Sequence, residues 1–294
     1  MTLYVTGAGG QVGTELLALA ASRGIEATGT DADTLDVTDA AAVRAAIERA
    51  APDAVVNAAA YTAVDRAEAD ADTATAVNRD GARHVAEACA ALGIPLVHIS
   101  TDYVFDGTKG TPYTPDDAVT PLSVYGRTKA EGEEAVRDAL AEHVIIRTAW
   151  VFSAHGHNFV RTMLRLARER DTLGVVADQW GGPTPAADVA RACLVAAEAA
   201  VAGRGIWGTF GHAGSPLATW CDLATETIRL GRELDPAVRA VVTPIPTADY
   251  PTPAARPARV ELDTSAFEAA YGLAAPDWRA GLADVVRALV ESDR

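Results

Sequence analysis

The chain has 294 residues, 49% of them hydrophobic, and a formal net charge of −15. The length and apolar content suffice for one large α/β domain, or for a larger and a smaller domain that share a cleft. The acidic charge argues against nucleic acid or an anionic membrane as a partner, and no apolar run approaches the roughly 20 residues that a membrane span needs.

Composition also bears on the compartment. Residues 1–6 read directly as a strand and lack the basic leader of a signal peptide. The cysteines are three and widely spaced, as is typical of buried reduced thiols: Cys89, Cys193 and Cys221. These features predict a cytoplasmic protein. The acidic excess leaves two hypotheses open, a surface adapted to high internal salt or an ordinary acidic cytosolic enzyme.

The first half of the chain alternates short β-branched runs with amphipathic stretches. The expected strands are residues 3–6, 26–30, 54–57, 96–100 and 144–147. Helices are expected between them, for example at 11–22 and 39–49. This alternation predicts a Rossmann-type doubly wound parallel sheet with right-handed crossovers. Residues 173–177, a helix at 186–202 and a strand at 206–210 are expected to extend that sheet.

The pattern changes after residue 150, where proline-bearing loops interrupt helices expected at 158–169, 219–230 and 278–291. We therefore expect two domains. Residues 1–150, with about 186–210, form the dinucleotide-binding Rossmann domain. A smaller substrate-binding α/β domain, about 151–185 and 211–294, covers the carboxyl ends of the strands, where ligands of open α/β sheets bind.

A glycine-rich turn joins the first expected strand to the first helix. Gly7, Gly10 and Gly13 allow a tight turn, and helix N–H groups then face a pyrophosphate. The position of this turn favours dinucleotide binding, with Gly7, Gly10, Gln11 and Val12 at the cofactor, over a purely structural turn.

The end of the second strand bears on the choice of cofactor. Asp31 can accept from the adenosine ribose hydroxyls and would repel a 2′-phosphate, and no arginine follows it directly. NADH is therefore favoured, while Asp33 and its loop leave NADPH open. Asp36 and Val37 are candidates for the adenine edge. The alternative for Asp31 is a solvated turn residue.

The next two strand ends supply further candidates. Small residues after the third strand let a flat cofactor pass close to the backbone, which makes Ala58, Ala60 and Tyr61 cofactor candidates. Ser100 and Thr101 end the fourth strand, where a hydroxyl can hydrogen-bond a substrate oxygen. Capping of the following loop is the alternative, especially for Ser100.

Tyr125 and Lys129 are spaced so that a helix places both side chains on one face. An ammonium beside a phenol lowers the cost of ionising the phenol, so we expect Tyr125 to be a proton donor or acceptor near neutral pH. Such a pair alone could be chance. Its order after the glycine turn and the Ser-Thr strand end makes it specific.

The chain resembles the extended short-chain dehydrogenase/reductase family. The resemblance rests on motifs in the family's order at residues 10–13, 57–65, 100–107, 125–129, 147–152 and 178–184. The sharpest is Ser100-Thr101-Asp102-Tyr103-Val104-Phe105-Asp106-Gly107. The C-terminal third matches loosely.

The resemblance implies reduction of a 4-keto sugar nucleotide, dTDP-4-dehydro-β-L-rhamnose, at C4 to dTDP-L-rhamnose, with NADPH or NADH. It implies that Tyr125 delivers the proton, that Lys129 holds the nicotinamide ribose and stabilises the tyrosinate, and that Thr101 shares the hydrogen bond to the reacting oxygen. Asp102 would line the sugar pocket. Related dehydratases carry an acid where this chain has Tyr103, which favours simple reduction.

Other substrate contacts are expected beyond the fifth strand. Trp150 could form an apolar wall against the sugar and nicotinamide, or only seal the domain junction. Asn158, Gln179 and Arg256 are candidates for the nucleotide part of the substrate, and a guanidinium such as that of Arg256 suits a pyrophosphate.

A metal is not expected. Some relatives use glutamates for a dimer-bridging magnesium, and Glu15 and Glu291 correspond to two of them, but the third position falls near Ala187. The loop pair His155 and His157 lacks ligand spacing. A homodimer stays open. Two other functions also stay open: a non-catalytic regulatory subunit resembling that of methionine adenosyltransferase, and a reductase of another 4-keto sugar nucleotide.

Overall fold

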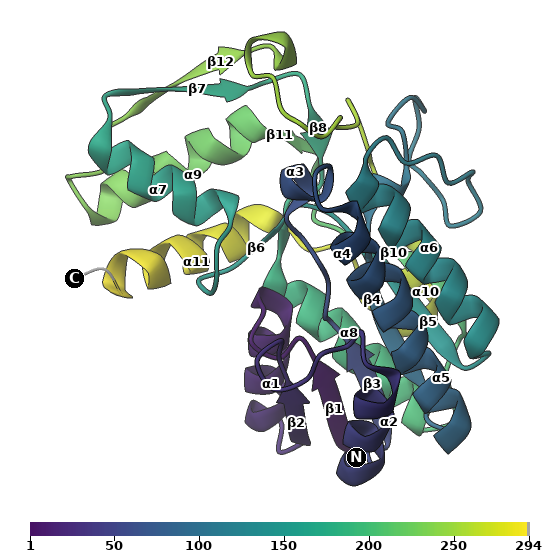
Figure 1. Cartoon of the computed structure of the whole chain (residues 1–294). Coiled ribbons are helices and arrows are strands. Elements are labelled where there is room, and N and C mark those ends of the chain that lie inside the picture. Colours follow the sequence, from purple (N-terminus) through teal and green to yellow (C-terminus); the bar gives the residue numbers. More distant parts are fainter. Residues whose placement is uncertain (293–294) are drawn as a thin grey trace.

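The computed structural model describes residues 1–292, and its centre is a six-stranded parallel sheet (Figure 1). The strand order is β10-β5-β4-β3-β1-β2. The strands are β1 (Thr2–Thr6), β2 (Glu26–Thr30), β3 (Ala54–Asn57), β4 (Leu96–Thr101), β5 (His143–Thr148) and β10 (Gly208–Gly211). The order reverses between β1 and β3, so a ligand crevice is expected at their carboxyl ends. The predicted doubly wound sheet is confirmed.

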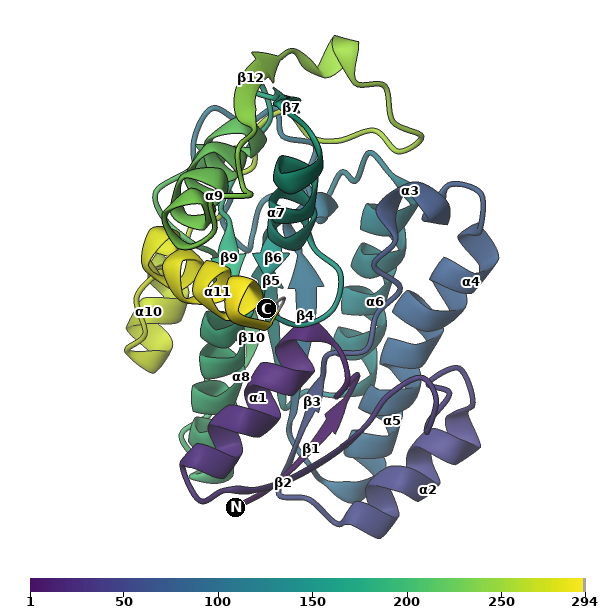
Figure 2. The ribbon, with the colours of Figure 1, turned by 90° about the vertical axis from the view of Figure 1, so that its left-hand side faces the viewer.

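Helices cover both faces of the sheet (Figure 2). On one face lie α1 (Gln11–Ser22) and α8 (Ala186–Val201). On the other lie α2 (Ala40–Ala50), α5 (Ala82–Leu92) and α6 (Val124–Ala139). Capping residues fix where these helices begin: Asp39 accepts from two backbone N–H groups at the start of α2, and Ser123 accepts from the N–H of Gly126 at the start of α6.

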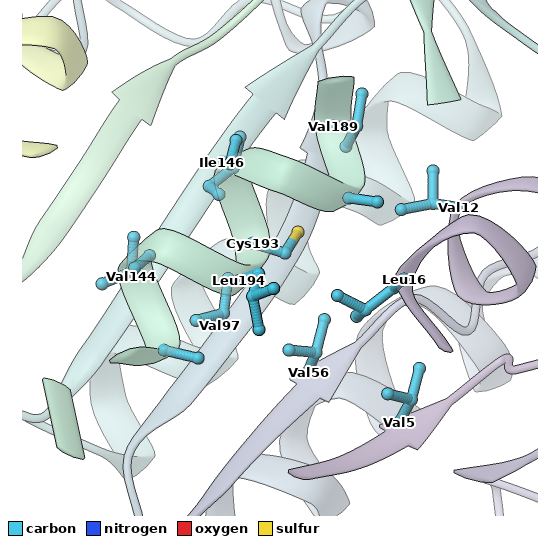
Figure 3. Close-up of a cluster of buried hydrophobic side chains, with 14 of the residues drawn as sticks. Val5, Val12, Leu16, Val56, Val97, Val144, Ile146, Val189, Cys193 and Leu194 are labelled. Carbon is cyan, nitrogen blue, oxygen red and sulfur yellow. The ribbon is translucent and has the colours of Figure 1, made fainter. Parts of the chain in front are cut away.

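The core between the sheet and the α1/α8 layer is mainly aliphatic (Figure 3). Strand side chains at Val5, Val56 and Val97 face Leu16 of α1 and Leu194 of α8. All five are almost wholly buried. Central parallel strands are covered on both faces, which is why their sequences read as continuous apolar runs.

Short helical segments connect β3 to α5. They are α3 (Val64–Ala67), α4 (Ala71–Thr75) and a π-helical segment, η1 (Ala76–Gly81), which continues directly into α5. After β4 comes the 3-10 turn η2 (Asp102–Val104). These segments lie near the carboxyl ends of the strands and shape the rim of the crevice.

A second lobe stands over that edge of the sheet (Figure 1). Its helices are α7 (Phe159–Glu169), α9 (Trp220–Leu234) and α11 (Trp278–Ser292). Its short strands are β6 (Val151–Phe152), β7 (Thr172–Val176), β8 (Trp180–Gly181), β9 (Thr184–Pro185), β11 (Ala218–Thr219) and β12 (Val241–Ile245), and η3 (Thr247–Asp249) follows them. Trp278, Leu282 and Val286 of α11 are buried in its core with Leu164 of α7 and Leu223 of α9.

One expectation about the sheet was wrong. Residues 173–177 do not extend it, because β7 pairs in parallel with β12 in the second lobe. The strand expected at 206–210 does join the sheet, as β10 beside β5. The strand that pairs with β7 is β12, which lies far along the chain, so the sequence around β7 does not reveal it.

The chain passes repeatedly between the two lobes. After the second lobe it returns to the sheet, where α10 (Ser265–Tyr271) packs on β10 and α8 through the buried Phe267. It then ends in α11 of the second lobe. Within residues 1–292, no helix combines the length and apolar character needed to cross a membrane.

Candidate active site

A cavity of about 970 Å³ lies between the carboxyl ends of the sheet strands and the second lobe. The glycine turn, the ends of β2, β3 and β4, and helix α6 line it from the sheet side. The loop after β6 and helices α7 and α9 line it from the second lobe. Its volume lies at the upper end of the range for small-molecule and cofactor sites.

Glycines let the first turn approach its neighbours closely. Gly7 has φ of 72°, and a Cβ there would lie 2.6 Å from the backbone nitrogen of Ala59. Gly10 is the N-cap of α1 and offers no capping side chain, so the helix N-terminus is open to an anion. Gly7, Gly10, Gln11 and Val12 all line the cavity.

The carboxylates after β2 mark the far end of the cavity. Asp31 accepts from the Thr34 hydroxyl at 2.9 Å, and a Cβ on Gly9 would lie 3.2 Å from its carboxylate oxygen. Asp36 accepts from the backbone N–H and the hydroxyl of Thr38, and the hydroxyl bond, followed by the backbone bond, lowers its pKa. Asp31, Asp36 and Val37 line the cavity as expected from the sequence.

A buried amide fixes the turn after β3. Asn57 accepts from the Thr6 hydroxyl at 2.7 Å and from the N–H of Ala59 at 3.2 Å. Ala58 and Ala60 consequently line the cavity.

Tyr61 points elsewhere. It does not line the cavity, because Asn78 accepts from its backbone N–H and its hydroxyl donates to Asp70 at 3.0 Å.

The end of β4 and the start of α6 bring the expected reactive groups together. The Thr101 hydroxyl donates to an oxygen of Asp102 at 3.1 Å, and it lies close enough to Tyr125 to affect the pKa of that phenol. The Tyr125 ring packs edgewise on Tyr103, with 5.6 Å between centroids. All four residues line the cavity, together with Lys129.

The expectation that the neighbouring ammonium makes Tyr125 easy to ionise was wrong for this structure. Burial raises the pKa of Tyr125 to about 12, although the Thr101 hydrogen bond opposes the rise. The Lys129 amine donates instead to the carbonyl oxygen of Ile99 at 2.7 Å. Burial lowers the pKa of Lys129 to about 8, although the negative charge of Glu133 acts to raise it. Burial also raises the pKa of Asp102 to about 7.

An ionic cluster lies directly beneath these groups. Glu133 accepts two bonds from Arg147, at 2.9 and 2.6 Å, and one from the Ser100 hydroxyl at 2.6 Å. Both charged side chains are buried, since Glu133 is 0% and Arg147 3% exposed. Tyr125, Lys129 and Glu133 recur every four residues on one face of α6. The cluster therefore ties the helix that carries the reactive groups to β4 and β5.

An aromatic wall faces the sheet across the cavity. Trp150 has φ of 45° and stacks on Trp220, with 3.6 Å between centroids. The Trp150 ring packs directly on Gly181, where a Cβ would overlap the indole, so Gly181 limits how far the ring can move. Phe159, Trp220 and Leu223 also line the cavity and were not identified from the sequence. A sequence gives no sign of which face of α9 turns toward a site.

The remaining substrate candidates are not brought together. Asn158 lines the cavity, but Gln179 and Arg256 do not. Gln179 donates to the Thr247 hydroxyl. Arg256 donates two bonds to Asp65, at 2.9 and 2.7 Å, and one to the carbonyl oxygen of Ala254 at 3.0 Å, so its guanidinium is occupied.

Among residues 1–292, no group of three or more His, Cys, Asp or Glu side chains is arranged to hold an ion.

Comparisons with known proteins agree with this arrangement. The family model of the RmlD substrate binding domain matches residues 1–291. A dTDP-4-dehydrorhamnose reductase of Sinorhizobium fredii is 43% identical over 292 residues, which cover 99% of this chain and 98% of the relative. One of Escherichia coli is 37% identical over 287 residues, 96% of each chain.

Solved structures show the same fold. A dTDP-4-dehydrorhamnose reductase of Clostridium acetobutylicum superposes with a TM-score of 0.91 at 37% identity, covering 98% of this chain and 99% of that one. One of Bacillus anthracis, solved in complex with NADP, gives a TM-score of 0.90 at 31% identity and covers 97% and 98%.

Proposed function

Since the chain belongs to the RmlD substrate binding domain family, we propose that it catalyses the NAD(P)H-dependent reduction of the C4 ketone of dTDP-4-dehydro-β-L-rhamnose to dTDP-L-rhamnose. The chain and the relatives named for this reaction match over nearly their whole lengths. The observation that carries the proposal is that Tyr125, Lys129 and Thr101 line one cavity together with the glycine turn.

Tyr125 is suited to be the proton donor. Burial raises the pKa of Tyr125 to about 12, so its hydroxyl is protonated at neutral pH. It can therefore donate its proton to the ketone oxygen as alkoxide character develops there. Thr101 lies beside that hydroxyl, and its own hydrogen bond to Asp102 fixes its orientation. We assign Thr101 to share the hydrogen bond to the reacting oxygen, and Asp102 to line the sugar pocket.

Lys129 is the residue that would hold the nicotinamide ribose. Its amine is buried in the cavity wall and already donates to the Ile99 carbonyl, which fixes its direction. The glycine turn and the open N-terminus of α1 would hold the pyrophosphate, with Ala58 and Ala60 beside it. When bound, the dihydronicotinamide supplies the hydride.

The adenosine end of the cavity bears on cofactor choice. Asp31, Asp33 and Asp36 line it, and none of the lining residues described there is a lysine or arginine. Carboxylates suit ribose hydroxyls and repel a 2′-phosphate. The charge pattern favours NADH, while the NADP complex of the Bacillus anthracis relative supports use of NADPH.

We assign substrate binding to the second lobe, about residues 151–185 and 211–294, acting with the sheet domain of residues 1–150 and about 186–210. Trp150, held against Trp220, would form the apolar wall beside the sugar. For Gln179 and Arg256 a substrate contact requires their present partners, Thr247 and Asp65, to be exchanged. A cytoplasmic location and a homodimer stay predictions.

The decisive test is to incubate the protein with dTDP-4-dehydro-β-L-rhamnose and NADH or NADPH, and to follow the loss of dihydronicotinamide absorbance. Formation of dTDP-L-rhamnose in step with cofactor oxidation is expected. Binding of the dinucleotide without turnover of any sugar nucleotide would contradict the proposal.

A further inference from the structure

The loop between β6 and α7 lies across the N-terminus of α1. We call residues 153–158 the strap. Its last three residues line the cavity together with Gly10 and Gln11 of the glycine turn. The strap thus brings the second lobe to the point where the sheet domain offers its helix N-terminus to an anion.

Hydrogen bonds fasten the strap to α1 through one side chain. The Gln11 amide oxygen accepts from the Asn158 amide at 3.0 Å and from the Ser153 hydroxyl at 3.2 Å. The Asn158 amide also donates to the Ser153 carbonyl at 2.8 Å, and its oxygen caps α7 by accepting from the N–H of Arg161. Both polar atoms of the Asn158 side chain are therefore occupied, the nitrogen by Gln11 and the strap and the oxygen by α7.

The two histidines of the strap face different surroundings. His155 lies 3.6 Å from the carboxylate of Glu15 on α1 and does not line the cavity. His157 does line the cavity. Between them, Gly156 comes so near that a Cβ there would touch the Gln11 side chain at 3.5 Å.

The cavity offers few cations to a bound anion. Among the lining residues that the structure describes, Lys129 is the one lysine or arginine, and its amine donates to a backbone carbonyl. Asp31, Asp33 and Asp36 add negative charge at the far end. A further N–H donor close to the N-terminus of α1 would strengthen the binding of a diphosphate, and His157 of the strap lines the cavity there with Gly10 and Gln11.

We propose that the strap is the outer wall of the diphosphate site. His157 donates an imidazole N–H to the phosphate on the nicotinamide side, and Asn158 is the positioning residue that holds the strap on α1 through Gln11. The side follows from the end of the strap, because Phe159 packs on Trp220, which stacks on Trp150 of the wall assigned to the sugar and nicotinamide. The inference rests on the dinucleotide binding in the proposed function and deepens it.

Binding of ADP-ribose and of 5′-AMP, measured by calorimetry on the full chain, tests the assignment of His157. Because a hydrogen bond to a charged group is lost, His157→Ala should weaken ADP-ribose about tenfold, with 5′-AMP changed less than about twofold. His155→Ala is the matched control, an exposed histidine of the same loop, and should change neither constant by more than about twofold. Unchanged ADP-ribose binding by His157→Ala, equal losses for both ligands, or an equal effect of His155→Ala would overturn the assignment.

Asn158→Asp tests the positioning role. Aspartate keeps the oxygen that caps α7, but it sets a carboxylate against the oxygens of Gln11 and Ser153. ADP-ribose should bind about fivefold more weakly, as expected for the loss of a net hydrogen bond. If Asn158 acts through His157, the double variant should bind no more weakly than His157→Ala. Additive losses would overturn the positioning role.

These binding measurements contain no sugar nucleotide. Absence of turnover alongside the expected ADP-ribose pattern would refute the proposed reaction and leave the strap assignment standing. Normal turnover, together with ADP-ribose affinities that the strap variants leave unchanged, would refute the strap assignment and leave the proposed reaction standing.

Discussion

Replacing Glu133 by glutamine should destabilise the protein far more than the same change elsewhere on α6. Glutamine keeps the size but removes the charge that faces Arg147, whose side chain is only 3% exposed. Removing one partner of a buried ion pair costs about 3–5 kcal/mol, because the other charge stays buried without compensation. Arg137, the other neighbour at 3.3 Å, is itself a cation and adds to the imbalance.

At about 2 °C per kcal/mol for a chain of this size, the melting temperature should fall by roughly 6–10 °C. Glu131→Gln is the matched control, two residues earlier on the same helix. Its partner Arg127 is 48% exposed, so the pair contributes about 0–1 kcal/mol and the shift should stay below about 2 °C. Calorimetric melts of the three proteins measure the difference, and equal shifts for the two variants would refute the reasoning.

At acidic pH, the difference in the free energy of unfolding between the native protein and Glu133→Gln should become smaller. Burial by itself would raise the pKa of Glu133, but the bonds and charge of Arg147, with the Ser100 hydroxyl, leave that pKa below its usual value. The stabilisation by Glu133 is therefore complete above the unfolded pKa of about 4.3, and it is lost as the pH falls through the folded pKa.

Three further predictions concern chemistry, cofactor choice and pH. Tyr125→Phe keeps the ring contact with Tyr103 but has no proton to give, so kcat should fall about 10²–10⁴-fold while calorimetry shows NADH binding unchanged; normal turnover would remove the acid assignment. Asp31→Ala should lower the ratio of kcat/KM for NADH to that for NADPH. An unchanged ratio would show that other residues determine the cofactor preference. Burial lowers the pKa of His212 to about 4, and neither ring nitrogen has a hydrogen-bond partner within residues 1–292. Because the unfolded state then binds the proton between about pH 6.5 and 4, His212→Leu should lose about 2 kcal/mol less stability than the native protein between pH 7 and 5. Identical losses in urea titrations would contradict this.

The sheet was predictable because its signals are local. The strands expected at 26–30 and 54–57 and the helix at 11–22 have the observed bounds, since β-branched runs and a glycine turn mark them within a few residues. The pairing of β7 with β12 was not predictable. It joins segments nearly seventy residues apart, and neither carries a pattern that excludes the central sheet.

The site divides in the same way. Residues at strand ends, such as Thr101 and Asp31, follow from topology, because parallel strands present their carboxyl ends at one edge. The pKa of Tyr125 did not follow from its spacing to Lys129, since burial and the direction of the amine decide it. Trp220 and the bond between Asn158 and Gln11 arise only when distant segments fold together.

The repeated passage of the chain between the lobes has a consequence for synthesis. The sheet receives its edge strand β10 and the supporting Phe267 from residues 208–271, and α11 (278–292) closes the second lobe. A nascent chain therefore cannot complete the sheet domain before residue 271, or the second lobe before α11, has left the ribosome. Neither lobe can be expected to survive as an excised fragment, and a shortened C-terminus would leave the buried face of α9 open to water.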